Sequence, residues 1–341
     1  MFRWDVIRST VIDGGRKGSV VTFRGDETNG RWQEGVAAWV YGFTIRNGSA
    51  INGGGINGNG AQVVIAQCDI HSNYAASAGG GIYGLSEDPS WIGHCKIHDN
   101  TAEVMGGGIC NVQPHGLAEA CLVYRNYAMF GGGVAMSGKL KRLTITGNVA
   151  SLDGGGAHNS GYYYGCIVWG NEAKRRGADI YDNTNDLEFV ASCVNVKSGV
   201  WGNYLALINL VASDPLFVDP MRGDFHLSPL SPVIDQQPIL IAILDLDGRQ
   251  VPIDGRADVG DEWPRQEDMG CYEFDPNAPT PTPTPAGPGD VRQDGRFDFL
   301  DLFELSLHWQ GSDETSRKAD INASGTVDAE DLLLLIELLT Y

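Results

Sequence analysis

Two acidic segments near the C-terminus have the residue types and the spacing of calcium-binding loops. Each is twelve residues long, begins and ends with aspartate, and carries further oxygen-bearing residues between them. Calcium in such a loop is bound by oxygens from positions 1, 3, 5, 7, 9 and 12, and glycine at position 6 allows the sharp turn. Gly295 and Gly325 occupy that position. The sequence therefore predicts one calcium site in residues 290–301 and a second in residues 320–331.

The two predicted calcium sites differ in one ligand. In the first loop the expected ligands are Asp290, Asp294, Arg296 (through its backbone carbonyl), Asp298 and Asp301. In the second loop they are Asp320, Asn322, Ser324, Thr326 (through its carbonyl), Asp328 and Asp331. Position 3 of the first loop is Arg292, which cannot ligate a cation. We therefore expect the first site to be weaker, or to be completed by water.

A second group of residues that could do chemistry recurs in the first half of the chain. His71, His98, Tyr124, Thr146 and Trp169 occupy one equivalent position of a repeated phrase, and Asp69 and Lys96 lie two residues earlier on the same face. Aromatic side chains on the flat face of a β-sheet can stack on sugar rings. One exposed stripe of candidate polysaccharide-binding residues would therefore contain His71, His98, Tyr124 and Trp169. The alternative is that they are ordinary outward-facing side chains of a sheet.

The elements that must position this stripe follow from an internal repeat. Glycine triplets begin at Gly53, Gly79, Gly106, Gly131 and Gly154. A phrase with alternating apolar and polar residues and a fixed asparagine, such as residues 68–75, precedes each later triplet. Alternation indicates strands, asparagine favours a turn, and the glycines favour close backbone approach. A strand, a turn and a Gly-rich strand every ~25 residues predict the coils of a parallel β-solenoid.

A column of cysteines belongs to the same repeat. Cys68, Cys95, Cys121 and Cys166 share one position with Leu143. Thiols in a column could bind a soft metal, but small buried hydrophobic side chains that fill the interior are favoured, because leucine takes the same place. The calcium-binding nonapeptide β-roll is disfavoured, since the sequence has neither its nine-residue period nor its aspartates.

The repeat resembles the right-handed parallel β-helix of the pectin-lyase-like superfamily, and about seven coils are expected in residues 1–210. Residues 211–275 contain Asp214-Pro-Leu-Phe217, Gly223-Asp-Phe-His-Leu227 and Ser231-Pro-Val-Ile-Asp235. These phrases resemble the C-terminal end of secreted bacterial β-helix proteins of the choice-of-anchor type, which implies a cap that closes the solenoid. Motifs expected of polygalacturonase-like relatives and of classical pectate lyases are missing, so catalytic residues are unknown.

Residues 276–289 alternate proline and threonine and are expected to form a semi-rigid extended linker. Each calcium loop after the linker is followed by an apolar helix pattern. The pair of loops resembles a type I dockerin in residues 290–341, which implies Ca²⁺ as cofactor and a cohesin-type scaffold domain as partner. Loop positions 10 and 11, which usually contact the cohesin, are Phe299, Leu300, Ala329 and Glu330. The two halves therefore differ, which puts two-way binding symmetry in doubt; a generic two-loop calcium module is the alternative.

Composition excludes several classes of function. The chain has 341 residues and a formal net charge of −19, which argues against nucleic acid as a partner. No apolar stretch approaches the ~20 residues of a transmembrane helix. The first residues do not resemble a signal peptide, yet the domain make-up implies a secreted or cell-surface bacterial protein, so we expect that the true N-terminus is missing.

Two functions are compatible with the sequence. The first is a polysaccharide-degrading or polysaccharide-binding component, of the glycoside hydrolase or lyase class, attached through a cohesin–dockerin interaction. The second is a non-catalytic surface or adhesive β-helix protein whose tail only anchors it. Acidic and basic residues that converge on one face would favour the first.

Overall fold

The computed structural model describes residues 2–23, 38–86, 90–112, 116–183, 190–198, 200–202, 206–238, 244–251, 253, 266–277, 319–322 and 324–339. The chain divides into two compact units. The first comprises Met1–Phe217 and His226–Pro276, and the second comprises Val218–Phe225 and Asn277–Tyr341. The described elements of the second unit are β30 (Phe217–Asp219), the 3₁₀ turn η1 (Pro220–Arg222), β31 (Asp224–Leu227) and helix α3 (Ala329–Leu339). The first residue of β30 and the last two residues of β31 belong to the first unit.

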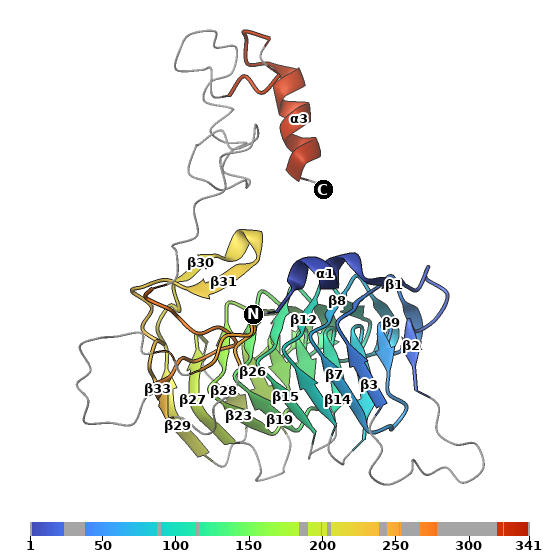
Figure 1. The fold of residues 1–341 in the computed structure, drawn as a ribbon, viewed down its shortest axis with the longest axis vertical. Helices are drawn as coiled ribbons and strands as arrows, with labels where there is room; N and C mark the ends of the chain where they lie inside the picture. Colours follow the sequence, from blue (N-terminus) through green and yellow to red (C-terminus); the bar gives the residue numbers. More distant parts are fainter. Residues whose placement is uncertain are drawn as a thin grey trace. The chain divides into compact units, whose positions relative to one another are not determined.

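The first unit is a parallel β-solenoid of about six coils (Figure 1), against the seven expected. Its strands stack coil on coil. One stack contains β3 (Ala38–Tyr41), β7 (Val63–Ala66), β11 (Trp91–Gly93), β15 (Leu117–Glu119), β19 (Lys139–Lys141) and β23 (Tyr162–Tyr164). The next contains β1 (Val11–Asp13), β4 (Thr44–Arg46), β8 (Asp69–His71), β12 (Lys96–His98), β16 (Leu122–Tyr124), β20 (Thr144–Thr146) and β24 (Ile167–Trp169). The long strand β27 (Val190–Val196) pairs with both β23 and β24 and so joins these two stacks, and β29 (Ala206–Val211) pairs with β27.

Two further stacks complete each coil. The third contains β5 (Ser49–Asn52), β9 (Tyr74–Ala78), β13 (Thr101–Ala102), β17 (Tyr127–Phe130), β21 (Val149–Asp153) and β25 (Glu172–Ala173). The fourth contains β2 (Val21–Thr22), β6 (Ile56–Asn57), β10 (Ile82–Leu85), β14 (Ile109–Val112), β18 (Val134–Ala135), β22 (Ala157–His158), β26 (Ile180–Asp182) and β28 (Val200–Gly202). The predicted coil is confirmed: the fixed asparagine lies between the second and third strands, and the glycine triplet lies between the third and fourth.

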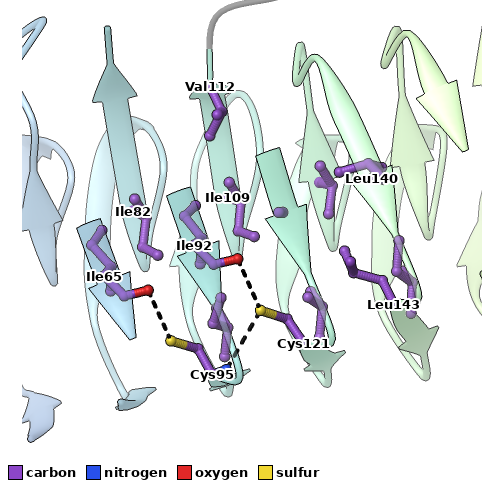
Figure 2. Close-up of a cluster of buried hydrophobic side chains, with 14 of the residues drawn as sticks. Ile65, Ile82, Ile92, Cys95, Ile109, Val112, Cys121, Leu140 and Leu143 are labelled. Atoms are coloured by element: carbon purple, nitrogen blue, oxygen red, sulfur yellow. Dashed lines mark hydrogen bonds between the residues drawn. The ribbon is translucent and has the colours of Figure 1, made fainter. Parts of the chain in front are cut away.

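The solenoid interior is filled by aliphatic side chains and by the cysteine column (Figure 2). Cys68, Cys95, Cys121 and Cys166 are fully buried free thiols in the same cluster as Leu143. The backbone amide of Cys95 donates to Cys121 Sγ at 3.5 Å. The favoured packing role of this column agrees with the structure, because the thiols contact apolar side chains and backbone carbonyls.

A buried asparagine ladder runs through the turns after the second strand stack. The side-chain carbonyl of Asn126 accepts hydrogen bonds from the backbone amide and the side-chain amide of Asn100, and its own amide donates to the carbonyl of Ile97. The same pattern links Asn73, Asn100, Asn126, Asn148 and Asn171. At one end Asp179 replaces asparagine as the acceptor for Asn171. Buried polar groups are therefore satisfied from one coil to the next.

The glycine triplets are required by the spacing of the coils. Gly79 has a φ of +65°, which favours glycine. A Cβ atom on Gly107 would lie 2.4 Å from the carbonyl oxygen of Gly132 in the next coil. Larger residues at these positions would therefore separate the strands.

The described part of residues 211–275, the segment that the sequence predicts as a cap and that is called the cap below, packs against the outer face of the second strand stack. Val233, Ile234 and Met269 form an apolar cluster with Ile167 of β24. The amide of Gly270 donates to the carbonyl of Gly165 at 2.8 Å. Strands β32 (Gln237–Pro238) and β33 (Gln266–Glu267) pair in antiparallel fashion. The cap thus adds a layer on the wall that the sequence analysis treated as exposed.

Candidate functional site on the solenoid wall and in the tail

The outer wall of the second strand stack carries the predicted column of His71, His98, Tyr124, Thr146 and Trp169. Parallel pairing places Arg46 opposite His71 and continues in register through all five residues. The rings of His71 and His98 stack with centroids 5.0 Å apart, and those of His98 and Tyr124 stack at 4.6 Å. The structure therefore places these five residues in one column, and three of their rings stack.

The exposure of this column differs from the expectation. Tyr124 is only 8% exposed, so a wholly exposed stripe is wrong at this residue. The side chain of His98 is 13% exposed. Because neighbouring coils lie about 4.8 Å apart, stacked rings cover one another and are not available as flat platforms for sugar rings. His71 and Trp169 remain partly exposed.

His98 lies between two carboxylates. Its Nε2 is 2.8 Å from Asp69 Oδ1, and its Nδ1 is 2.6 Å from Asp99 Oδ2. Burial would lower the pKa of His98, but the hydrogen bonds to Asp69 and Asp99 outweigh burial and raise it above its ordinary value. Burial would raise the pKa values of Asp69 and Asp99, but the hydrogen bonds with His98 lower them. Asp99 also accepts from Arg125 at 2.9 Å.

The pKa of His71 is shifted in the opposite direction to that of His98. Burial lowers its pKa, and the positive charge of His98 lowers it further. Its Nδ1 lies 3.0 Å from Ser72 Oγ. His71 and His98 therefore form a stacked pair whose pKa values are shifted in opposite directions, that of His71 down and that of His98 up.

The N-terminal helix α1 (Trp4–Ser9) lies beside this wall (Figure 1). Arg8 Nε is 3.9 Å from Asp69 Oδ2, and the ammonium of Lys96 lies 4.6 Å from the centroid of the Trp4 ring. Burial and the charge of Arg8 lower the pKa of Lys96. The ammonium group of Lys96 makes no hydrogen bond or ion pair with any residue that the structure describes.

The cap contributes a histidine–aspartate pair near the same place. His226 Nε2 is 2.9 Å from Asp247 Oδ2. Burial would raise the pKa of Asp247, but the hydrogen bond with His226 and the charges of His226, Arg249 and Lys96 lower it. His226 and Asp247 could not be predicted to lie here, because they follow Lys96 by 130 and 151 residues in the chain. Residues 245–249 form a turn in which Asp245 Oδ1 accepts hydrogen bonds from the amides of Asp247 and Arg249.

The second predicted calcium loop is described except for Ala323, whereas the first loop, with Asp290, Asp294, Arg296, Asp298, Asp301, Phe299 and Leu300, lies outside the described residues. Asp320 Oδ1 and Oδ2 accept from the amides of Ser324 and Gly325. The buried carboxylate of Asp331 accepts from the amides of Ile321, Asn322 and Asp328. Gly325 has a φ of +96°. The carboxylates of Asp320 and Asp331, at positions 1 and 12, thus accept hydrogen bonds from backbone amides of their own loop.

This donor set fits calcium. Asp320, Asn322, Ser324, Thr326, Asp328 and Asp331 supply only oxygen ligands, and the positive φ of Gly325 makes the turn that such a loop needs. Among the described residues, no group of three or more His, Cys, Asp and Glu side chains has the arrangement of a metal site. Ala329 and Glu330 are exposed at the start of α3.

Comparison with known proteins identifies the tail. Residues 288–340 match the dockerin type I domain family. Neither a curated protein nor a solved structure matches the chain. Type I dockerin domains generally bind calcium, imply attachment to a cohesin domain, and are typical of extracellular or cell-surface proteins. The helices in the described ranges lack the length and apolar character needed to cross a membrane. The protein thus combines a parallel β-solenoid with a C-terminal type I dockerin domain.

Proposed function

We propose that this is an exported bacterial β-helix protein that binds or degrades polysaccharide while its dockerin domain holds it on a cohesin-bearing scaffold. One observation carries the proposal. A chain with a dockerin domain presents acidic and basic groups, namely Asp69, His71, Lys96, His98 and Asp99, together on one face of its solenoid.

The grouped residues suit acid–base chemistry. Glycoside hydrolysis uses carboxyl groups as acid, base or nucleophile, and lyase chemistry needs a basic group that accepts a proton. His71 and Lys96 have lowered pKa values, which makes each a better proton acceptor near neutral pH than an ordinary imidazolium or ammonium. We leave the choice between hydrolase and lyase to experiment.

We further propose that calcium is held in the tail by the two loops that the sequence indicates. In the second loop the ligands would be Asp320, Asn322, Ser324, Thr326, Asp328 and Asp331. Phe299, Leu300, Ala329 and Glu330 would contact the cohesin. Because these two pairs differ in chemistry, one orientation of the dockerin on the cohesin should dominate.

The domain limits are part of the same proposal. A pectin-lyase-like right-handed helix over residues 1–210, a cap over 211–275, a linker over 276–289 and the tail over 290–341 would separate the ligand-binding wall from the anchor. A spacer rich in proline and threonine suits this role, because such sequences favour the extended polyproline II conformation.

A non-catalytic surface protein is the second candidate. Both ring nitrogens of His98 are engaged with carboxylates, and helix α1 and the cap lie on part of the wall. These contacts favour a binding surface over an open catalytic cleft.

A panel of polysaccharides incubated with the full chain and calcium tests the proposal. New reducing ends alone would indicate a hydrolase, and unsaturated uronate products would indicate a lyase. Binding without products would favour the non-catalytic candidate. Neither binding nor product, with a folded protein, would contradict a polysaccharide function. His98→Gln, compared with the exposed and distant Lys139→Gln, identifies whether the wall is responsible.

A further inference from the structure

The hydrogen bonds of His98 fix its charge. Each ring nitrogen faces a carboxylate oxygen, at 2.8 Å and 2.6 Å. A neutral imidazole has one N–H donor only, so its other nitrogen would face an oxygen acceptor without a proton between them. Asp69 and Asp99 together therefore hold His98 as an imidazolium, with a fixed orientation.

His71, which stacks on His98, is the neighbouring group that can change its charge by taking up a proton. Its ring is parallel to that of His98 within 13° and is partly exposed. Asp69 and Asp99 favour its protonation, whereas His98 and Arg46 oppose it. Arg8 and Lys96 lie next to Asp69 and add positive charge on the same side. An anion that entered here would reduce this repulsion and so favour protonated His71.

The wall around the pair is locally positive in a protein that is strongly negative. Its cations are Arg8, Arg46, Lys96, His98 and Arg125. Among the described residues, its carboxylates are Asp13, Asp69 and Asp99. Five positive and three negative charges leave an excess of two, against a net charge of −19 for the chain. Asp247 also faces Lys96, but it is paired with His226 and Arg249.

We propose that this wall, from Arg46 to Arg125 around His71 and His98, binds the anionic group of an acidic polysaccharide, a carboxylate or a sulfate, and that protonation of His71 tightens the binding as the pH falls. The inference rests on the proposed function and narrows its substrate class. His98 and the arginines would supply permanent positive charge, and His71 would add one further charge below its pKa.

Binding of three hexasaccharides to the full chain tests the proposal. The probes are hexagalacturonate, sulfated cellohexaose and unmodified cellohexaose, measured by calorimetry at pH 7.5 and pH 5.0 at constant ionic strength. We expect at least one anionic probe to bind more tightly than the neutral one, and about two- to fivefold more tightly at pH 5.0, the effect of one partly exposed charge. The preferred anionic probe separates carboxylate from sulfate recognition.

Variants assign the effect to residues. His71→Gln should bind equally at both pH values, Arg125→Gln should weaken binding about two- to fivefold at both, and Lys139→Gln on another strand stack should match the wild type. Arg125→Gln keeps the test decisive if a histidine variant does not fold. Tighter binding of the neutral probe, or a pH dependence that persists in His71→Gln, would overturn the inference while leaving a polysaccharide function intact.

Inorganic sulfate separates this inference from the proposed function. Nuclear magnetic resonance of the histidine side chains in the full chain should show sulfate raising the pKa of His71. If sulfate acts in this way while no oligosaccharide binds, the anion site stands and the polysaccharide function fails. If neither sulfate nor an anionic hexasaccharide affects His71, the anion site itself is wrong.

Discussion

Two columns of residues run along the solenoid, one inside and one outside, and they differ in what repeats. The inner column repeats asparagine from Asn73 to Asn171, because each side chain bonds to the same residue type in the neighbouring coil. The outer column, two residues earlier in each phrase, changes type in almost every coil. Its members stack or pair with one another but do not need identical partners. The stability of the solenoid therefore depends on the inner column, and the side-chain types of the outer column are free to vary.

The largest effect is expected from breaking the inner column. Asn126→Leu would remove the buried acceptor of both Asn100 amides and the donor to the carbonyl of Ile97, while the Asn100 side chain would keep its hydrogen bond to Ile70. We expect a loss of about 3 kcal/mol or more in the free energy of unfolding, measured by urea denaturation of the full chain. Thr101→Ala on the neighbouring strand is the control and should change little. A loss below about 1 kcal/mol for Asn126→Leu would mean that the ladder does not hold the coils together.

The glycines that allow close coil packing should be nearly as sensitive. Gly107→Ala places a methyl group 2.4 Å from the carbonyl oxygen of Gly132, and we expect a loss of about 3 kcal/mol. Gly147→Ala is the matched control, since its φ is +60° but nothing lies within 4 Å. There only backbone strain remains, about 1 kcal/mol. Thermal unfolding compares the two variants, and equal losses would contradict the packing argument.

A smaller and pH-dependent effect is expected on the outer column. His98→Gln removes two charged hydrogen bonds, and we expect a loss of about 1–3 kcal/mol at pH 6. Because the pKa of His98 is raised on folding, its stabilisation is fully present below the unfolded value of about 6.5 and is lost as the pH rises through the folded value. The difference between wild type and variant should therefore shrink from pH 6 towards pH 9. A difference that is constant over this range would show that His98 is not held as an imidazolium.

The smallest effect on stability is expected at the edge of the outer column. Arg125 is about half-exposed and pairs with Asp99, so Arg125→Gln should change the free energy of unfolding by less than about 0.5 kcal/mol. The same variant should weaken the binding of anionic oligosaccharides. If Arg125→Gln greatly lowered the free energy of unfolding and left oligosaccharide binding unchanged, the outer column would serve stability and not binding, which would contradict the roles assigned to the two columns.

Much of the fold could be predicted from the sequence, because the spacing of the repeat determines the length of each coil and which residues lie above one another. The glycine triplets, the asparagine turns and the register of His71, His98, Tyr124 and Trp169 all follow from one spacing. The type I dockerin followed from the two twelve-residue loops and the linker before them. These features depend on residues that are close in the chain or one coil apart.

The surroundings of the wall could not be predicted in the same way. Tyr124 is buried and stacks on His98. Lys96 contacts the ring of Trp4 in helix α1, and Ile167 packs against the cap, so two distant parts of the chain lie on the wall. His226 and Asp247 reach the site from the cap, and no local pattern places them there. Asp99 directly follows His98 in the sequence, so a contact between them could have been considered. The hydrogen bond itself depends on the conformation of the turn, which the sequence does not specify.

One measurement tests directly whether the anchor and the wall act as described. The full chain is captured on a surface that carries a type I cohesin, first in calcium and then in a chelator, and the preferred acidic polysaccharide is passed over the captured protein. The account predicts capture only in calcium, retention of the polysaccharide by the wild type and by Lys139→Gln, and weaker retention by Arg125→Gln. Capture that is independent of calcium, or equal retention by all three proteins, would contradict it.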